Sequence, residues 1–407
     1  MAMDGRDPAS ERVDVVPTTA TRAQWDAFAQ ECGSSFWSAR RGHRMWQWKF
    51  HARYRTRLLD ILVTRGGERY KVGQCAVGIG RRFRVFSDGI QLRRGYETVW
   101  RAAMAGVLAE LGPGRYVYGS FWSTEPPREA GLAGLRCVET VMSRPLAVEV
   151  VELGRWPCWE AYAKAVSKNI IRNIRKASAH TPGLAHSVRN GLRSLGHIPL
   201  LLPLRASMYA RKSVWFSGTR TRAFGNYVLR VVSLRRYVAT HVAWSGRTPV
   251  AAISTVSFGG NLYYTDGGSS RALPGGGWTL VMRVLEDHWR ATPTGRFMLG
   301  YTDLVADVPE GQWVSPVRYR QDCRVSAIRT SIVVFDYRLA GSAPRPIPNL
   351  LFERTVPAFE GIEEQPGKVQ SCGHRGRDRQ PVADCGRKLD GADENKRFEQ
   401  PAEAEAG

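Results

Sequence analysis

The chain has no long apolar run. Its longest apolar stretches, Ile198 to Leu204 and Ser331 to Phe335, are far shorter than the roughly 20 residues that a helix needs to cross a bilayer, and Pro199 and Pro203 interrupt the first. The opening residues, MAMDGRDPASERVD, are charged and polar where a secretory signal needs an apolar stretch. We therefore expect a cytoplasmic protein without a membrane span.

Paired cysteines are also lacking. The seven cysteines are an odd number scattered over the whole length, and no two of them form a CxxC pair. This pattern favours reduced thiols over a disulfide framework. Cys372, His374 and Cys385 are possible metal ligands, but no obvious fourth ligand accompanies them. We therefore expect no metal site.

Acidic residues are scarce before residue 351. The whole chain has 59 Lys and Arg against 37 Asp and Glu, a formal net charge of +22. Residues from Leu351 onward have 9 basic against 12 acidic side chains, so the first 350 residues carry 50 against 25. A body this basic attracts nucleic acid, a phosphorylated cofactor or an anionic membrane surface, although an arginine-rich composition can also leave only a solvated surface.

Length and composition indicate more than one packed core. A chain of 407 residues with 43% apolar residues exceeds the usual single-domain size. We expect a polar leader over residues 1–20, one domain over 21–152, a second over 153–340, and a tail over 341–407. The tail is rich in Pro, Gly and charge, which predicts that it is largely disordered.

The first half shows helix and strand patterns in alternation. The apolar spacing and the turn residues predict a helix over Arg22 to Cys32, a hairpin of Leu58 to Thr64 with Tyr70 to Gly78, a helix over Tyr96 to Leu111, a strand over Tyr116 to Trp122, and one or two strands over Val138 to Leu153.

The second half contains the clearest pattern. Helices are predicted over Pro199 to Ser213 and Asn226 to Arg235, followed by strands over Tyr237 to Trp244, Val250 to Phe258 and Leu262 to Asp266, a glycine-rich turn at Pro274 to Gly277, a helix over Trp278 to Trp289 and a strand over Phe297 to Tyr301. Three antiparallel strands, a turn, a helix and a further strand make one compact α/β unit.

A basic helix precedes this unit. In the segment YAKAVSKNIIRNIRKA, Lys164, Lys168, Arg172 and Lys176 recur every four residues and Arg175 lies beside them. This spacing predicts that all five side chains project from one side of a helix. Such a stripe would bind a polyphosphate or an RNA backbone, and the alternative is a merely solvated face.

The residues Ser167 to Ala177 carry a resemblance. They are similar to the SKKxRRNIRKA segment that introduces the catalytic domain in the Fem-type and BioF-related branch of the GNAT acyltransferases, and the similarity extends over Trp159 to Arg324. It implies an α/β, GNAT-like fold with two tandem domains around mixed, largely antiparallel sheets, the first domain being degenerate. Fem-type members take an aminoacyl group from transfer RNA, whereas other GNAT proteins use acyl-CoA or an acyl-carrier protein.

The resemblance departs from the family pattern in two places. The R/Q-x-x-G-x-G/A motif of CoA-dependent members is out of register by one between Arg271 and Gly277. Gly275, Gly276 and Gly277 could still present backbone N–H groups to a phosphate at a helix start, or simply punctuate a loop. The related branch often ends with an aromatic-Lys pair, and this chain has Tyr319-Arg320 instead.

The resemblance also suggests where the chemistry lies. Transfer to an amine needs a base for the amine proton and donors for the oxyanion. Tyr264 and Asp266, and Tyr301 and Asp303, lie on segments that are adjacent in the GNAT arrangement. Asp303 would orient or deprotonate the amine and Tyr301 would protonate the leaving group or polarise the carbonyl, while the alternatives are turn capping for the aspartates and packing for the tyrosines.

The sequence therefore predicts an acyltransferase. Its donor would be acyl-CoA or aminoacyl-tRNA, its acceptor a small-molecule amine, and transfer RNA a possible partner, without metal or redox cofactor. The alternative is a non-catalytic RNA-binding or adaptor protein with a GNAT-like shell. Peripheral membrane binding is a weaker alternative that rests on charge alone.

Overall fold

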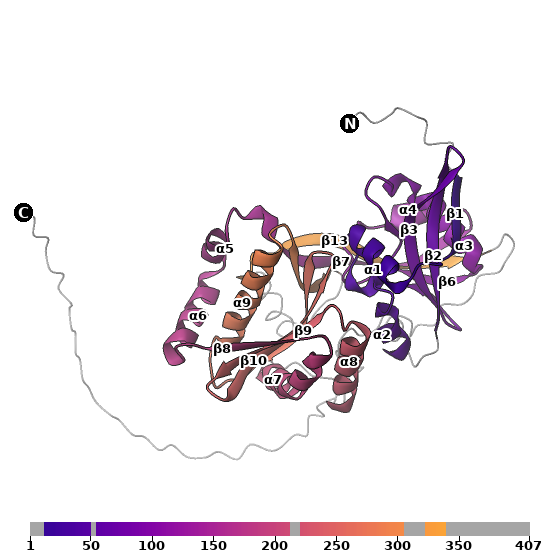
Figure 1. Cartoon of the computed structure of the whole chain (residues 1–407). Coiled ribbons are helices and arrows are strands. Elements are labelled where there is room, and N and C mark those ends of the chain that lie inside the picture. The colour runs from indigo at the N-terminus through magenta and orange to yellow at the C-terminus, as the bar shows by residue number, and fades with distance from the viewer. Residues whose placement is uncertain (1–11, 50–53, 212–219, 305–321, 339–407) are drawn as a thin grey trace, which may run out of the picture. The chain divides into compact units, whose positions relative to one another are not determined.

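The computed structural model describes residues 12–49, 54–211, 220–304 and 322–338 of the chain (Figure 1). The predictions on the Tyr319-Arg320 pair, on Cys372, His374 and Cys385, and on the tail lie outside these residues. Among the helices of the described ranges, none is long and apolar enough to cross a membrane.

The first half folds much as its patterning predicts. Its elements are β1 (Arg12–Pro17), α1 (Arg22–Glu31), η2 (Phe36–Ser38), α2 (Gly42–Lys49), β2 (Arg55–Arg65), β3 (Glu68–Ile79), β4 (Arg84–Phe86), β5 (Gln91–Leu92), η3 (Glu97–Val99), α3 (Trp100–Leu111), β6 (Gly114–Tyr118) and α4 (Glu129–Ala133). The hairpin of β2 and β3 turns at Gly66 and Gly67, whose φ angles of +60° and +81° suit a tight two-residue turn.

The segment assigned to the polar leader contains a strand. β1 pairs antiparallel with β2, with Arg12 opposite Thr64. Val13 and Val15 pack against the core beneath α3, where an added Cβ on Gly106 would lie only 2.6 Å from the Val15 side chain. A short alternating strand at a sheet edge is easily hidden in a polar composition, which explains the difference.

The second half contains the remaining elements. They are β7 (Val138–Glu152), η4 (Leu153–Arg155), α5 (Trp159–Ala165), α6 (Lys168–His180), β8 (Ala185–Asn190), η5 (Gly191–His197), α7 (Ile198–Arg211), α8 (Arg220–Ser233), β9 (Val238–Ser245), β10 (Thr248–Phe258), β11 (Asn261–Ser269), α9 (Gly276–Ala291), β12 (Arg296–Asp303) and β13 (Ser326–Tyr337). The predicted meander is β9 to β11, and the predicted helix and strand after the glycine turn are α9 and β12.

One sheet carries both halves. Its strands follow the order β1-β2-β3-β4-β6-β13-β7-β12-β11-β10-β9-β8. In each half an antiparallel meander leads through a helix into a parallel neighbour, since β4 pairs with β6 after α3, and β11 pairs with β12 after α9. This repeated unit confirms the tandem α/β, GNAT-like architecture around a mixed, largely antiparallel sheet.

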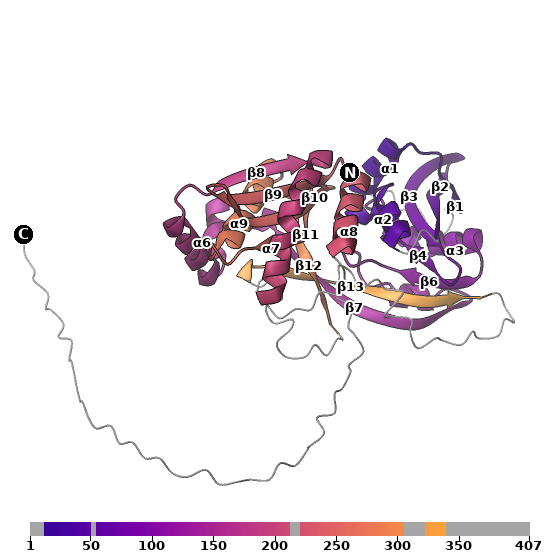
Figure 2. The ribbon, with the colours of Figure 1, turned by 90° about the horizontal axis from the view of Figure 1, so that it is seen from below.

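Two long strands join the halves. β7 pairs with β12 on one edge and with β13 on the other, and β13 continues onto β6 (Figure 2). The boundary expected near Glu152 therefore coincides with the end of a strand that serves both halves.

Helices cover both faces of the second half. α5, α6 and α9 pack over one core, with Tyr162, Ile170 and Leu280 buried, and α6 lies beside α9 (Figure 1). α7 and α8 pack over the other core, with Leu201 and Tyr227 buried. We call these the α9 face and the α7 face of the sheet.

Candidate functional site

The basic segment forms two helices instead of one. α5 ends at Ala165, and α6 begins at Lys168 after Ser167, whose hydroxyl accepts a hydrogen bond from the Ile170 N–H at 3.3 Å. The Ser167 N–H donates to the carbonyl of Asp322 at 3.1 Å, and Val166 is buried with an extended backbone. The prediction that Lys164 shares one face with the later cations was therefore wrong, because capping and core packing break the helix between them.

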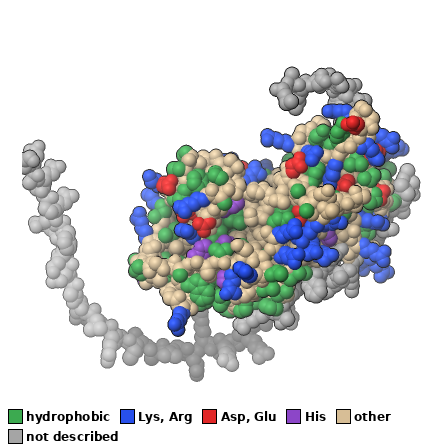
Figure 3. Space-filling model, viewed as in Figure 1, with side chains coloured by type: hydrophobic (Ala, Val, Ile, Leu, Met, Phe, Trp, Pro, Cys, Tyr) green, Lys and Arg blue, Asp and Glu red, His purple; other side chains and the backbone are tan. Residues whose placement is uncertain are grey.

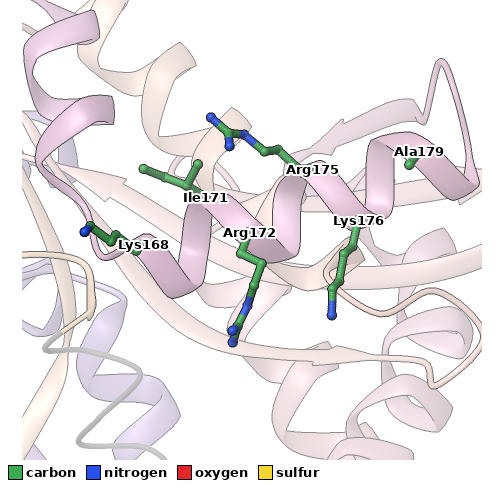
Figure 4. Close-up of a pocket in the computed structure, with 6 residues that line it drawn as sticks. All are labelled: Lys168, Ile171, Arg172, Arg175, Lys176 and Ala179. Atoms are coloured by element: carbon green, nitrogen blue, oxygen red, sulfur yellow. The ribbon is translucent and has the colours of Figure 1, made fainter. Parts of the chain in front are cut away.

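Four cations remain together on α6. Lys168, Arg172, Arg175 and Lys176 are exposed and, with Ile171 and Ala179, line a surface hollow of about 580 Å³. Figure 4 shows Arg172 and Lys176 pointing to the same side of the helix and Arg175 pointing away from them. The side-chain oxygen of Asn169 accepts from Arg172 at 2.9 Å and so helps to orient that guanidinium group.

The glycine turn lies directly against α6. Gly275 has a φ of +89°, and an added Cβ there would lie 2.0 Å from the backbone oxygen of Asn173. Only glycine permits this approach, because any side chain would collide with the helix. The turn of Gly275 to Gly277 therefore adjoins α6, the helix that carries the cations. The sequence suggested both features for donor binding.

The start of α9 offers partial positive charge next to α6. The Gly276 N–H donates to the Leu273 carbonyl at 3.2 Å and the Thr279 N–H donates to the Gly275 carbonyl at 3.0 Å, so part of the turn is satisfied internally. The first N–H groups of a helix and its dipole together favour an anion. Arg271 is exposed in the same connection between β11 and α9.

The strands that flank this connection diverge. β11 and β12 pair only where Asn261, Leu262 and Tyr263 face Arg296, Phe297 and Met298. Register shifts at Ser254/Thr255 and at Met298/Gly300 bend both strands, so that β11 continues along β10 and β12 continues along β7. Strand edges that no longer pair with each other present main-chain donors and acceptors to an extended ligand.

The proposed catalytic residues whose side chains are described, Tyr264, Asp266 and Tyr301, do not share one face of the sheet. Tyr264 packs on the α9 face, whereas Asp266 faces α7 and α8. The bulge in β11 interrupts the alternation that would have put both on one face. Tyr301 packs against Phe121 with ring centroids 4.4 Å apart and the ring planes tilted by 39°, next to the core of the α7 face. Asp303 pairs through its backbone with Leu146, and its side chain lies outside the described part.

Asp266 belongs to a buried polar cluster. It forms an ion pair with Arg205 at 2.8 Å, each side chain being 6% exposed, and it accepts a hydrogen bond from the Tyr227 hydroxyl. Burial, reinforced by the carboxylate, raises the pKa of Tyr227 well above its usual value. Gly268 allows α7 to approach β11 closely, since an added Cβ at this position would lie 2.2 Å from the backbone nitrogen of Arg205. These contacts fasten α7 and α8 to β11.

A buried glutamate, Glu149, was not among the site residues predicted from the sequence. Glu149 on β7 is 6% exposed, pairs with Gly300 of β12 and Ala327 of β13, and accepts a hydrogen bond from the Thr302 hydroxyl at 2.8 Å. The signal was present as a single acidic residue inside the apolar run of Ala147 to Val151. Buried carboxylates in such runs need a partner, so they mark positions of structural or chemical importance.

Comparisons with known proteins agree on the fold. No protein-family model and no curated protein sequence matches the chain. The crystal structure of FemX superposes with a TM-score of 0.59 at 9% sequence identity, covering 80% of this chain and 97% of that one. A conserved protein of unknown function from Bacteroides thetaiotaomicron VPI-5482 gives 0.50 at 10% identity, covering 80% and 100%.

A looser likeness is found to a tandem GNAT protein from the clavulanic acid biosynthesis pathway, with a TM-score of 0.41 at 14% identity. Likeness at these identities establishes how the backbone is arranged, and the chemistry must be argued from the side chains. The superposition on FemX shows that the chain has the GNAT-like, Fem-type fold that its sequence resemblance implied.

Proposed function

We propose that this protein transfers an acyl or aminoacyl group from a phosphate-bearing donor, acyl-CoA or aminoacyl-tRNA, to an amine. One observation carries the proposal: Gly275 packs against the backbone of Asn173, so α6, the helix that carries the four cations, contacts the turn that opens α9. The arrangement fits a donor that places phosphates on α6 and extends its reactive end along β11.

The transfer itself requires few groups. The amine nitrogen attacks the donor carbonyl, the ester or thioester bond breaks, and the amine proton passes to a base while the leaving oxygen or sulfur takes a proton. We assign the base to Asp303 and the proton donor to Tyr301, on the strand that diverges from β11. Tyr264 would contact the donor from the α9 face, while Asp266 supports the site by holding α7 and α8 in place.

A donor assay tests this proposal. The full chain is supplied with a generic primary amine and either acyl-CoA or aminoacyl-tRNA, with and without RNase. Charge reversal at Arg172 and Lys176 is expected to raise KM for the donor by about tenfold or more, since each phosphate contact is worth about 1 kcal/mol or more. Arg247→Glu, an exposed change in the turn between β9 and β10, is the matched control and should leave KM unchanged. Equal effects of both changes would contradict donor binding at α6.

The catalytic assignment has its own test. Asp303→Asn and Tyr301→Phe are each expected to lower kcat by about 100-fold with little change in donor KM, as is typical when a general acid or base is removed. Unchanged turnover in both variants would overturn the assignment. Donor binding without turnover in the wild-type chain would instead favour the RNA-binding or adaptor alternative.

A further inference from the structure

A long part of the chain has no negative side chain. Between Glu160 and Asp266 the sequence has 16 Lys and Arg and neither Asp nor Glu. Its exposed cations include Arg189 on β8, Arg193 on η5, and Arg235 and Arg236 directly after α8. Because the same stretch of sequence has no carboxylate, these arginines have no acidic neighbour along the chain, and a surface on which they gather attracts anions.

A buried aspartate gathers arginines from distant segments. Asp26 on α1 is 2% exposed, accepts hydrogen bonds from the Arg40 N–H at 2.7 Å and the Tyr237 hydroxyl at 2.9 Å, and lies 3.5 Å from the Arg22 guanidinium. It therefore holds together α1, the segment before α2 and the start of β9. The single negative charge of this junction points inward.

The arginines around the junction form one cluster, which we call the arginine surface: Arg22, Arg41, Arg44, Arg235 and Arg236. The positive charges of the other members, with that of Arg22 foremost, lower the pKa of Arg41. Arg44, Arg235 and Arg236 are exposed. Figure 3 shows Lys and Arg side chains gathered over α2, with hydrophobic side chains next to them over α8.

Exposed apolar side chains adjoin the arginine surface. Phe224 and Val232 on α8 are 45% and 46% exposed, and Leu192 at the start of η5 is 48% exposed. An added Cβ on Gly191 would lie 2.6 Å from the Arg235 carbonyl oxygen, which places Leu192 beside the cationic segment. Apolar side chains that gather next to a cationic cluster suit an interaction surface, whereas single exposed ones are ordinary.

The arginines and the exposed apolar side chains together favour one kind of anionic partner over another. A nucleic-acid backbone is bound by cations and by aromatic rings that stack on bases, and it gains little from exposed Leu and Val side chains. An anionic bilayer attracts arginines to its headgroups and accepts aliphatic and aromatic side chains at the boundary with the acyl chains. The mixture on α8 and η5 matches the second description.

We propose that the arginine surface, together with Leu192, Phe224 and Val232, docks the protein peripherally on an anionic lipid bilayer. The apolar side chains enter the headgroup region while the arginines contact lipid phosphates. This inference goes beyond the transfer reaction and does not depend on it, since the surface includes none of the residues assigned to donor binding or catalysis.

Vesicle sedimentation tests the proposal with the full chain. Vesicles of phosphatidylcholine with about 30% phosphatidylglycerol should bind the protein, vesicles of pure phosphatidylcholine should not, and binding should fall as NaCl rises. Charge reversal at Arg235 and Arg236 should weaken binding by about tenfold or more, because each arginine contributes roughly a factor of five near an anionic surface. Phe224→Ser with Val232→Ser should weaken it by about tenfold as well.

Two matched controls separate docking from general charge. Arg247→Glu removes an exposed cation elsewhere, and Tyr70→Ser removes an exposed ring that is 46% exposed on β3. Both should bind vesicles like wild type. Failure of the wild type to bind, or an equal loss in the controls, would overturn the proposal. A loss in the arginine variants without any loss in the Phe224 and Val232 variants would also overturn it, because it would show attraction by charge alone without entry of the apolar side chains.

A measurement without substitutions guards against misfolded variants. Hydrogen exchange of the wild-type chain should slow in peptides from 191–193 and 224–236 when phosphatidylglycerol vesicles are added. Unchanged exchange in these peptides while the protein is vesicle-bound would show that another face makes the contact, and the proposal would fail.

Discussion

At the residue scale, Asp266 shows how one bulge changes the role of a side chain. In a regular strand it would share a face with Tyr264, next to the start of α9. The register shift opposite Ser254 and Thr255 turns it toward α7, where Arg205 and Tyr227 enclose it. A carboxylate in this position is stable only as part of its cluster.

The replacement Asp266→Asn is accordingly expected to reduce the free energy of unfolding by about 3 kcal/mol, since it leaves the buried guanidinium of Arg205 without its anionic partner. Tyr227→Phe, which removes one hydrogen bond, should cost about 1 kcal/mol. Urea unfolding measures both values. Wild-type stability of the Asn variant would show that Asp266 does not hold α7 and α8.

His241 makes stability depend on pH. Its ring stacks on His186 at 5.6 Å, and burial followed by the neighbouring histidines lowers its pKa from 6.5 to about 3. The folded protein keeps this ring neutral while the unfolded chain protonates it below pH 6.5. Stability contributed by the neutral ring is therefore lost as pH falls from about 6.5 toward 3.

Replacing His241 by Gln tests this linkage. Burial raises the pKa values of the Asp88 and Glu125 carboxyls to about 6 and about 7, so these groups stabilise the folded protein as the pH falls. The informative quantity is therefore the difference in unfolding free energy between the variant and the wild type at each pH. The variant should gain stability relative to wild type as pH is lowered from 6.5 to 4, measured by urea unfolding at each pH. A pH-independent difference would refute the linkage.

At the scale of elements, the contact between α6 and α9 depends on one glycine. Gly275→Ala is expected to destabilise the protein by at least about 2 kcal/mol and to weaken donor binding, because its φ is +89° and its Cβ would meet Asn173. Gly277→Ala is the matched control, since its Cβ would lie 3.2 Å from the Ser269 side chain and its φ is not positive. Thermal unfolding and donor affinity measure the two effects, and equal behaviour of the variants would contradict a special role for Gly275.

The start of α6 depends on its cap. Ser167→Ala removes the acceptor for the Ile170 N–H and should cost about 1 kcal/mol of unfolding free energy. Ser167→Asn retains a capping oxygen and should recover most of this loss. If both variants unfold like wild type, the hydrogen bond of the Ser167 N–H to Asp322 is sufficient to fix the helix start.

Helices and strands were predicted well where residues next to them in the sequence fix their ends. Gly66 and Gly67 fix the β2–β3 hairpin, and the glycine turn fixes the start of α9, because these residues choose backbone conformations directly. The break between α5 and α6 was missed because the helical periodicity continues through Val166 and Ser167 in sequence. Burial of Val166 and the bond to Asp322, far along the chain, override that periodicity.

At the scale of the whole molecule, β7 and β13 decide how the protein unfolds. Because β7 pairs with β12 and β13, and β13 pairs with β6, neither half can lose its core without exposing strands of the other. We expect one cooperative thermal transition for the described halves, with coincident far-UV and tryptophan signals. Two well-separated transitions would show that the halves are independent.

A fragment experiment extends this prediction. Residues 153–340 alone lack β7 and leave one edge of β12 unpaired, so this fragment is expected to aggregate or stay unfolded. Adding residues 138–152 restores that neighbour and should improve soluble yield. Equal folding of both fragments would support the boundary at residue 152 as a true domain limit.

The sequence by itself determined the local elements and the cationic character of α6, because turn residues, periodicity and charge act over a few neighbouring positions. The GNAT-like fold class was implied by the family resemblance of Ser167 to Ala177. Only the tertiary structure decided that Asp266 is held by Arg205, that the glycine turn meets α6 at Asn173, and that Glu149 lies buried between strands. Those outcomes depend on bulges and on contacts between segments distant in the chain. No local pattern specifies which of two faces a side chain will occupy once a strand has slipped by one residue.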